Sequence, residues 1–329
     1  MVIARELTRA LGNAGHDASI VVTPDYGFGR QSRAYWETWR GDVTRVDGRP
    51  VDQVISLRYP SYAVRHPRHV CWLNHTMREY YDLWPRFSAT LSPQGRLKES
   101  VRRVTIQAAD RYLLGHNVTK LFVQSKTIAD RLAMWPSIRP EVLHPPAPAR
   151  AYRTDDYGPE LFFVSRLTAL KRTDLVVRAL AEPVAAGVRI IIAGEGEERP
   201  ALERLAADLN VASRITFTGR VTDEQVLDRL ARCRAVVFPP LQEDYGFVTV
   251  EAFASRKTVV TCRDSGGPAE LVTDGVSGFV CEPTPASIAT AMARLSDDRA
   301  LAERLGAAAF DAGTTLTWPG TVRTLVVES

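Results

Sequence analysis

The sequence has few cysteines and no long hydrophobic run. Four of its 329 residues are cysteine, and no two of them form a CxxC pair, so the sequence predicts neither a zinc site nor a disulfide framework. Apolar runs such as residues 189–194 (RIIIAG) are far shorter than the ~20 residues that a membrane-spanning helix requires. The first residues lack the charged and apolar segments of a signal peptide. We therefore expect a cytoplasmic protein with buried thiols.

Charge is unevenly distributed along the chain. Hydrophobic residues make up 45% and charged residues 24%, as in soluble globular proteins, and the length suggests about two domains. Residues 1–150 contain 22 Lys and Arg against 13 Asp and Glu, a net charge of +9, whereas residues 151–329 carry −5. A basic half suggests contact with an anionic surface or substrate, and the alternative is a solvated face with no binding role.

A proline-rich segment, residues 144–159, interrupts the apolar pattern and predicts a domain boundary near residue 155. Beyond it, short apolar runs alternate with helical patterns, as in a doubly wound sheet of parallel strands. The expected strands are residues 161–165, 188–193, 215–217, 235–238 and 258–261. The expected helices are residues 171–181, 199–208, 223–232 and 247–255, the third of them capped by Thr222.

The first half alternates less clearly. The expected helices are residues 2–15, 100–113 and 125–134, and the expected strands are residues 18–22, 54–57, 70–73 and 121–124. Residues 318–327 are expected to be a helix or an extended segment. A doubly wound domain normally opens with a strand and a glycine-rich turn. This chain begins inside the first predicted helix, so we expect that strand to be missing.

Two acidic residues, Glu243 and Glu251, flank a predicted strand-to-helix turn at Gly246. A helix that begins at Phe247 points backbone N–H groups and the positive end of its dipole beyond the strand, which suits a diphosphate. Glu251 would accept hydrogen bonds from ribose hydroxyls, and Glu243 would lie in the loop beside the ligand. The alternative is a solvated loop acid and a carboxylate that stabilises the helix dipole.

Arg166 and Lys171 follow the strand predicted at residues 161–165, at the end where doubly wound domains bind ligands. Two such cations could clamp a diphosphate, and the alternative is a solvated pair in a loop. The Gly194-x-Gly196 pair follows the next strand. Arg199 occupies the third glycine position of the dinucleotide fingerprint, so an NAD or FAD oxidoreductase is not supported.

Five ordered motifs complete the pattern: SRL and K at 165–171, GEG at 194–196, TGRV at 218–221, E-x7-E at 243–251 and GG-x2-E at 266–270. Over residues 161–320 they resemble the donor domain of glycosyltransferase family 4, whose members are retaining enzymes of the GT-B fold, with two Rossmann-like domains facing a cleft. The first half resembles the family's acceptor domain, and Trp318 resembles the tail that crosses back to it. The resemblance implies an acceptor-side domain over residues 1–155 with 316–329, and a nucleotide-sugar domain over 156–315.

The resemblance also implies roles for individual residues. Arg166 and Lys171 would hold the donor diphosphate. Glu251 would bind ribose, and Glu243 would contact the sugar hydroxyls near the reacting carbon. His75, just after a predicted strand, resembles a histidine that lies beside the donor sugar, and a structural histidine is the alternative. The further donor-binding residues would be Gly196, Gly219, Arg220, Val221, Gly246 and Phe247.

The expected function is therefore the transfer of a hexose, with retention, from a GDP- or UDP-linked sugar to a glycan or lipid-linked acceptor. The resemblance implies no metal and no cofactor besides the donor. The basic first half adds an anionic membrane surface as an expected partner, with a peripheral position on the inner face of the membrane, and no nucleic acid is expected. Two alternatives remain, a GT-B sugar-nucleotide epimerase and a truncated, inactive sugar-nucleotide-binding protein.

Overall fold

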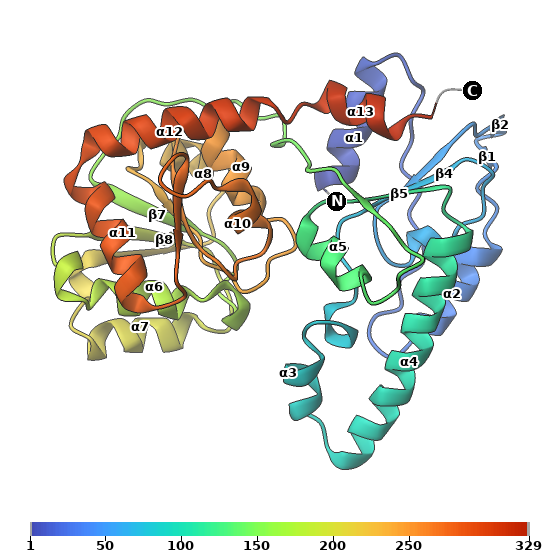
Figure 1. The fold of residues 1–329 in the computed structure, drawn as a ribbon, viewed down its shortest axis with the longest axis horizontal. Coiled ribbons are helices and arrows are strands. Elements are labelled where there is room, and N and C mark those ends of the chain that lie inside the picture. Colours follow the sequence, from blue (N-terminus) through green and yellow to red (C-terminus); the bar gives the residue numbers. More distant parts are fainter. Residues whose placement is uncertain (1, 328–329) are drawn as a thin grey trace. The chain divides into compact units, whose positions relative to one another are not determined.

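The computed structural model describes residues 2–327 and separates the chain into two compact units (Figure 1). The first unit comprises the described residues up to 145 together with those from 318 onward, and the second comprises residues 146–317. The sequence predicted a boundary near residue 155 and a return to the first domain at residue 316. None of the described helices is long and apolar enough to cross a membrane.

The second unit is built on a six-stranded sheet in which every neighbouring pair is parallel. Its inner strands are buried runs rich in Val, Ile and Phe, because helices cover both faces of such a sheet, whereas the edge strand β9 (Ile215–Gly219) is only partly buried. In order across the sheet the strands are β12 (Gly278–Cys281), β11 (Val259–Cys262), β10 (Val236–Val237), β7 (Glu160–Val164), β8 (Arg189–Ala193) and β9.

The helices of the second unit are α6 (Thr173–Leu180), α7 (Arg199–Asp208), α8 (Asp223–Arg232), α9 (Phe247–Ala254), α10 (Gly267–Leu271), α11 (Pro285–Asp297) and α12 (Arg299–Thr314). Helix α12 packs against α9, and α11 packs against α6 (Figure 1). Both α7 and α8 have the predicted bounds. The predicted cap of α8 is confirmed, because the Thr222 hydroxyl accepts a hydrogen bond from the Gln225 N–H at 3.2 Å.

The order of the strands reverses between β7 and β10. From β7 the chain continues outward through β8 and β9, and it then returns to add β10, β11 and β12 on the other side. In doubly wound sheets, ligands bind beyond the carboxyl ends of the strands at such a reversal. The loops that follow β7 and β10 are therefore where a ligand site is expected.

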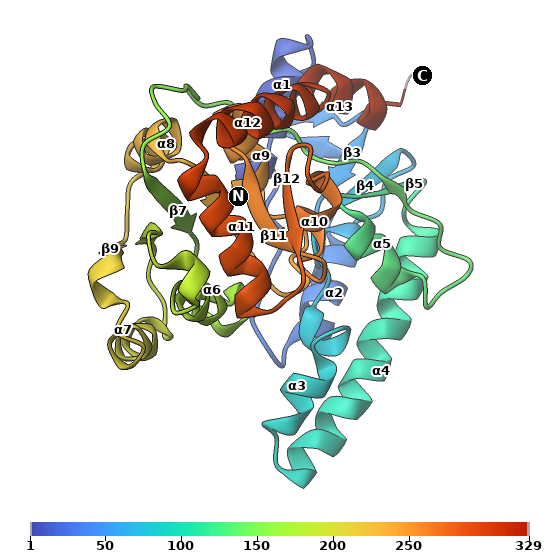
Figure 2. The same cartoon turned by 60° about the vertical axis from the view of Figure 1, so that its left-hand side comes forward.

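The first unit contains a parallel four-stranded sheet and a two-stranded antiparallel ribbon. The ribbon is β1 (Arg45–Val46) and β2 (Arg49–Pro50), and the sheet is β3 (Val54–Ser56), β4 (His69–Leu73), β5 (Lys120–Val123) and β6 (Glu141–Val142). Its helices are α1 (Val2–Asn13), α2 (Gln31–Arg40), α3 (Trp84–Ala89), α4 (Pro93–His116), α5 (Lys126–Leu132) and α13 (Trp318–Leu325). Figures 1 and 2 both show α3 and the start of α4 extending away from this sheet.

The C-terminal segment is helical and belongs to the first unit. Helix α13 packs on α1, and the ring of Trp318 meets the ring of Trp72 edge-on, with 6.3 Å between the centroids. The Gln53 amide donates to the Leu325 carbonyl at 2.6 Å and accepts from the Val327 N–H at 2.9 Å. Of the two conformations left open by the sequence for this segment, the helix is therefore the one adopted.

The strand predicted at residues 18–22 is wrong. This segment has no regular secondary structure, and the side chains of Val21 and Val22 are 53% and 76% exposed. Branched residues favour a strand only where a neighbouring strand and a buried face are available, and no described strand pairs with this segment. Helix α4 also begins at Pro93 instead of residue 100, because the Ser92 hydroxyl caps it by accepting from the Gly95 N–H at 3.1 Å.

A buried carboxylate organises the core of the first unit. Asp110 of α4 accepts hydrogen bonds from the hydroxyls of Tyr35, Tyr62 and Tyr81, the last at 2.5 Å. Burial raises the pKa of Asp110 to about 6, because the charged form loses its hydration, although the three hydroxyl donors oppose this effect. The folded state therefore binds a proton at Asp110 more tightly than the unfolded chain does.

The Asp110→Asn variant tests this linkage. The folded pKa lies above the ordinary value of 3.8, so the stability contributed by proton binding is fully present below about pH 4 and is lost as the pH rises through about 6. Asn cannot ionise. The free energy of unfolding of the wild type, minus that of the variant, should therefore fall between these pH values in urea titrations. A difference that stays flat between these pH values would contradict the prediction.

Candidate active site

The loops after β7 and β10 bring two predicted site residues into contact. The Lys171 ammonium donates to Glu243 Oε2 at 2.5 Å, with side chains that are 11% and 21% exposed. The same ammonium lies 5.6 Å from the centroid of the Phe238 ring. The two residues are far apart in sequence, yet the reversal of strand order places both beyond the carboxyl ends of neighbouring strands. A partly buried cation and carboxylate thus lie where a doubly wound domain binds its ligand.

The backbone fixes the position of Glu243. Its N–H donates to the Ser265 carbonyl at 2.8 Å, and its carbonyl accepts from the Gly267 N–H at 2.9 Å. Gly266, between Ser265 and Gly267, has a φ of +72°, and a Cβ there would lie 2.4 Å from the backbone carbonyl oxygen of Glu243. The Gly-Gly pair noted in the sequence therefore allows the loop after β11 to pass directly against the loop that carries Glu243.

Arg172, which sequence reasoning missed, ties these loops together. Its guanidinium makes a bidentate ion pair with Asp264, at 2.7 and 2.8 Å, and donates to the Pro239 and Pro240 carbonyls at 2.8 and 2.7 Å. Its backbone is left-handed, with φ of +50°, so α6 begins at Thr173 instead of the predicted residue 171. Nothing in the local sequence distinguishes this arginine from a solvated neighbour of Lys171.

Helix α9 begins directly beside this loop. Gly246 has a φ of +77°, and a Cβ there would lie 2.8 Å from Pro268 Cγ and 3.0 Å from Phe238 Cε1. The first helical hydrogen bond runs from the Thr249 N–H to the Gly246 carbonyl at 2.9 Å. The amides of Phe247 and Val248 therefore lie in the first turn, where the partial positive charge of the helix attracts anions.

Glu251 lies further along α9 and is only 7% exposed. Its Oε1 accepts from Arg150 Nη1 at 2.9 Å and from the Tyr152 hydroxyl at 3.4 Å. Arg150 also pairs with Asp223 at 3.1 Å. Burial raises the pKa of Glu251, and the neighbouring Arg150 opposes this rise. The sequence indicated Glu251 but not its two partners, Arg150 and Tyr152, which belong to the proline-rich segment where a domain boundary was predicted.

The predicted Gly196 has a packing role. A Cβ at Gly196 would lie 2.1 Å from the Leu167 carbonyl oxygen, and a Cβ at Gly194 would lie 1.8 Å from the Ser165 carbonyl oxygen. The Leu167 N–H donates to the Glu195 carbonyl at 2.8 Å. The loops after β7 and β8 therefore touch through their backbones. Arg166, which lies in the sequence between the contacting residues Ser165 and Leu167, has an exposed side chain.

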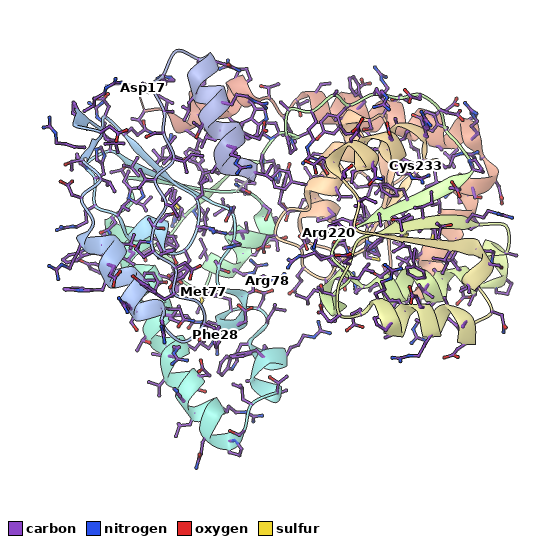
Figure 3. The ribbon with its side chains drawn as sticks, turned by 180° about the vertical axis from the view of Figure 1, so that it is seen from behind. Asp17, Phe28, Met77, Arg78, Arg220 and Cys233 are labelled. Atoms are coloured by element: carbon purple, nitrogen blue, oxygen red, sulfur yellow. The ribbon has the colours of Figure 1, made fainter. Side chains whose placement is uncertain are left out.

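The predicted base-binding segment follows β9. Gly219 has a φ of +72°, and its carbonyl accepts from the Gly194 N–H at 2.8 Å. The side chain of Arg220, labelled in Figure 3, is 84% exposed and pairs with Glu195 at 3.1 Å. Val221 is half-buried. The loops after β7, β8 and β9 thus lie side by side along the carboxyl edge of the sheet.

His75 belongs to the first unit, just after β4. Its Nδ1 is buried and has no hydrogen-bond partner among the described residues, and the same holds for Asn74 Oδ1 and Thr76 Oγ1. Three consecutive residues at the carboxyl end of this strand thus each have a buried polar atom without a hydrogen-bond partner among the described residues. Among the described residues, no group of three or more His, Cys, Asp or Glu is arranged to hold a metal ion.

Residues 149–311 match the family model described as "Glycosyl transferases group 1". The chain is 34% identical over 274 residues to alpha-D-kanosaminyltransferase of Streptomyces kanamyceticus, covering 80% of this chain and 65% of that protein. It is 33% identical over 178 residues to D-inositol 3-phosphate glycosyltransferase of Nocardia farcinica, covering 51% of this chain and 39% of that protein. The chain therefore spans 65% or less of the length of these relatives.

Two solved structures resemble almost the whole chain. Sucrose-phosphate synthase from Thermosynechococcus elongatus has a TM-score of 0.72 at 17% identity, covering 98% of this chain and 91% of that one. WaaG, a glycosyltransferase involved in lipopolysaccharide biosynthesis, has a TM-score of 0.69 at 16% identity, and the match covers 99% of this chain and 95% of WaaG. The predicted fold class, α/β with parallel sheets of the GT-B type, is thereby confirmed, although, of the described sheets, only that of the second unit shows the reversal of strand order that marks double winding.

Proposed function

We propose that this chain is a glycosyltransferase that moves a hexose from a nucleotide diphosphate sugar to a glycan or lipid-linked acceptor. The observation that carries the proposal is the contact between Lys171 and Glu243 at the strand-order reversal, beside the N-terminus of α9. The family match and the relatives described above, all of them glycosyltransferases by name, support the same class. Solved structures of similar fold contain UDP, which supports a nucleotide-linked donor.

The charge developing on the leaving group explains why these residues would be needed. When the bond between the anomeric carbon and the diphosphate breaks, the nucleotide gains negative charge and the sugar gains oxocarbenium character. Arg166, Lys171 and the first-turn amides of α9 would stabilise the nucleotide, because preorganised donors cost no reorganisation during the reaction. Glu243 would hold the donor sugar hydroxyls and keep Lys171 in place.

The proposed reaction proceeds with retention and without a metal ion. The acceptor hydroxyl would attack from the face that the diphosphate leaves, forming the new carbon–oxygen bond as the old one breaks, and a leaving phosphate oxygen would take the acceptor proton. Lys171 already pairs with Glu243, which suits a carboxylate that orients the sugar better than one that attacks it. The donor would be GDP- or UDP-linked, with ribose at Glu251 and the base beside Gly219 to Val221.

A donor screen tests the proposal. UDP, GDP and their sugars should raise the melting temperature of the chain, since a ligand that binds only the native state stabilises it. Mass spectrometry with simple glycan acceptors should then detect transfer. Stabilisation without transfer would favour an inactive sugar-nucleotide-binding protein, and alteration of the donor sugar without an acceptor would favour an epimerase. Either outcome would contradict a transferase.

Arg172→Gly should lower kcat by roughly tenfold or more, and it should also lower the free energy of unfolding. Gly relieves the left-handed backbone, worth about 1 kcal/mol, which offsets part of the stability lost with the four hydrogen bonds. The loop carrying Glu243 would lose its tether. Arg256 also has a left-handed backbone, with φ of +54°, and makes a cation–π contact with Phe310 outside the site. Arg256→Gly should therefore leave kcat unchanged, and equal losses in the two variants would refute a positioning role for Arg172.

The basic first half further suggests an anionic acceptor or an anionic membrane surface. Its +9 charge should hold the protein on vesicles that contain acidic lipids at low salt and release it at high salt, because mobile ions screen exposed charges. Cosedimentation over a range of salt concentrations measures this effect. Neutral vesicles are the control, and salt-independent partitioning would contradict an electrostatic attachment.

A further inference from the structure

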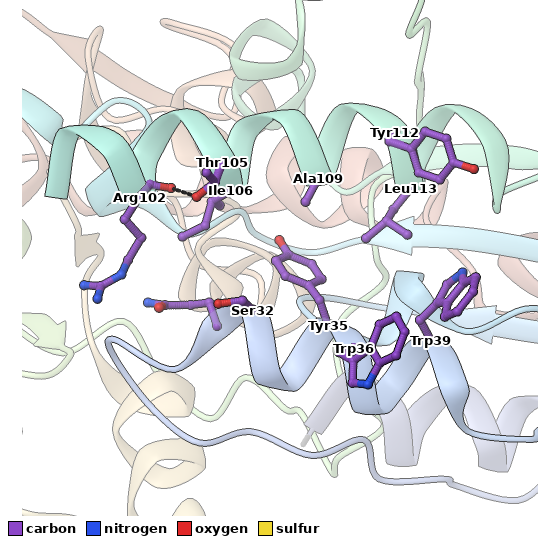
Figure 4. A pocket seen from close by; sticks show the side chains of 11 residues that line it. Ser32, Tyr35, Trp36, Trp39, Arg102, Thr105, Ile106, Ala109, Tyr112 and Leu113 are labelled. Carbon is purple, nitrogen blue, oxygen red and sulfur yellow. Dashed lines mark hydrogen bonds between the residues drawn. The ribbon is translucent and has the colours of Figure 1, made fainter. Parts of the chain in front are cut away.

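A groove of about 280 Å³ lies between α2 and α4 of the first unit. Figure 4 shows the two helices side by side, with Ser32 and Arg102 near one end of the groove and Trp39 and Tyr112 near the other. Small residues, Ala109 in particular, leave the space between the helices open. The groove is composed of residues that the proposed transfer reaction does not use.

The walls are mainly apolar and aromatic. Trp36 and Trp39 stack with 5.5 Å between their centroids, and Tyr35 and Tyr112 face the same space. Trp36 is 55% exposed and Tyr112 is 57% exposed, although Trp36 stacks on Trp39 and Tyr112 stacks on His116 with 4.5 Å between the ring centroids. Such walls favour an aliphatic or aromatic ligand and disfavour a phosphate or a free sugar.

One polar atom in the groove lacks a partner. Gln31 is only 3% exposed, and its Oε1 has no hydrogen-bond donor among the described residues. The buried Tyr35 hydroxyl, in contrast, donates to Asp110, and the exposed Thr105 hydroxyl donates to the Arg102 carbonyl at 2.8 Å. A buried acceptor without a partner is costly, so this end of the groove would be stabilised by a ligand that carries a hydroxyl.

Helix α4 continues the apolar surface outside the groove. Leu97, Val101 and Val104 follow one another at helical spacing and are 69%, 60% and 66% exposed. Tyr112 lies about two turns beyond Val104, between this stripe and the groove, which it also lines. An aliphatic chain that followed this stripe would enter the groove beside Thr105 and Tyr112, which both line it.

We propose that the groove between α2 and α4 binds the aliphatic tail of an amphiphile whose head carries a hydroxyl. The tail would lie against Trp36, Trp39 and Tyr112, and the hydroxyl would donate to Gln31 Oε1. The apolar lining accounts for the tail, and the unsatisfied amide oxygen accounts for the polar head. The amphiphile could reach the groove as a free molecule or from a bilayer, and the experiment below separates these sources.

The test uses 1-monodecanoylglycerol, below its critical micelle concentration, with calorimetry and tryptophan fluorescence as readouts. Ala109→Phe fills the groove and should weaken binding at least tenfold. Ala108→Phe is the matched control, because Ala108 is the neighbouring residue of α4, is exposed and does not line the groove. Gln31→Leu should weaken binding severalfold, since it removes one hydrogen bond. Free glycerol should not bind, because it lacks the tail.

Vesicles with and without the monoacylglycerol form the second arm. If the groove takes its ligand from a bilayer, vesicles containing the monoacylglycerol should retain the wild type and Ala108→Phe but not Ala109→Phe. If both variants bind the free amphiphile and the vesicles equally well, the groove is not the site and the proposal is overturned. Absence of any binding by the folded wild type, with folding checked by circular dichroism, would overturn it as well. Neither readout depends on sugar transfer.

Discussion

Glu243→Ala is expected to lower kcat for sugar transfer by about 10²–10³-fold, the effect of removing one preorganised group from a reacting centre. Glu243 contacts Lys171 at 2.5 Å, and its own backbone is fixed by Ser265 and Gly267. The substitution therefore removes the carboxylate without loosening the loop. Nucleotide affinity, measured as the Kd for UDP or GDP by calorimetry, should change only severalfold, because the diphosphate is held by other groups.

Lys171→Ala should also lower kcat strongly, and it should weaken nucleotide binding more than Glu243→Ala does. The two residues act as a contacting pair, so the double variant should lose about as much kcat as the worse of the single variants. Lys126→Ala is a matched control, because Lys126 pairs with Asp130 on an exposed surface of the first unit. If the losses of kcat in the two single variants added up in the double variant, the proposed division of roles would be contradicted. A full loss of nucleotide affinity in Glu243→Ala would contradict it as well.

Gly246→Ala is expected to destabilise the second unit by about 2–5 kcal/mol, the sum of a left-handed backbone penalty and an overpacking penalty. Gly246 has a φ of +77°, and the added Cβ would lie 2.8 Å from Pro268 and 3.0 Å from Phe238. The start of α9 must shift to relieve these contacts. Turnover should therefore fall even in conditions under which the variant stays folded, because the first-turn amides would move with the helix.

Gly275→Ala separates the two penalties. Gly275 has nearly the same φ, +72°, but a Cβ there would have no atom within 4 Å. In this variant the free energy of unfolding should fall by only about 1 kcal/mol, because the left-handed backbone is the only source of strain. Urea unfolding measures both variants, and a steady-state assay measures the effect on turnover. Equal losses of stability in the two variants would show that Pro268 and Phe238 do not crowd Gly246.

The second unit shows how far local patterns reach. The bounds of α7 and α8, and the Thr222 cap, follow from apolar periodicity and capping chemistry that lie within a few residues of one another. The parallel strands are equally readable, because strands buried on both faces are continuous apolar runs. In the first unit the same reasoning failed at residues 18–22, because none of the strands that the structure describes pairs with this β-branched run.

The candidate site shows where sequence reasoning stops. The sequence by itself determined that Glu243, Glu251, Arg166 and Lys171 lie at strand ends and at a helix start. Only the tertiary structure decided their partners, because these contacts join residues far apart in the chain: 72 positions for Lys171 and Glu243, 101 for Arg150 and Glu251, and 92 for Arg172 and Asp264. Local periodicity places a side chain on its own element, whereas the packing of whole elements decides which side chains meet.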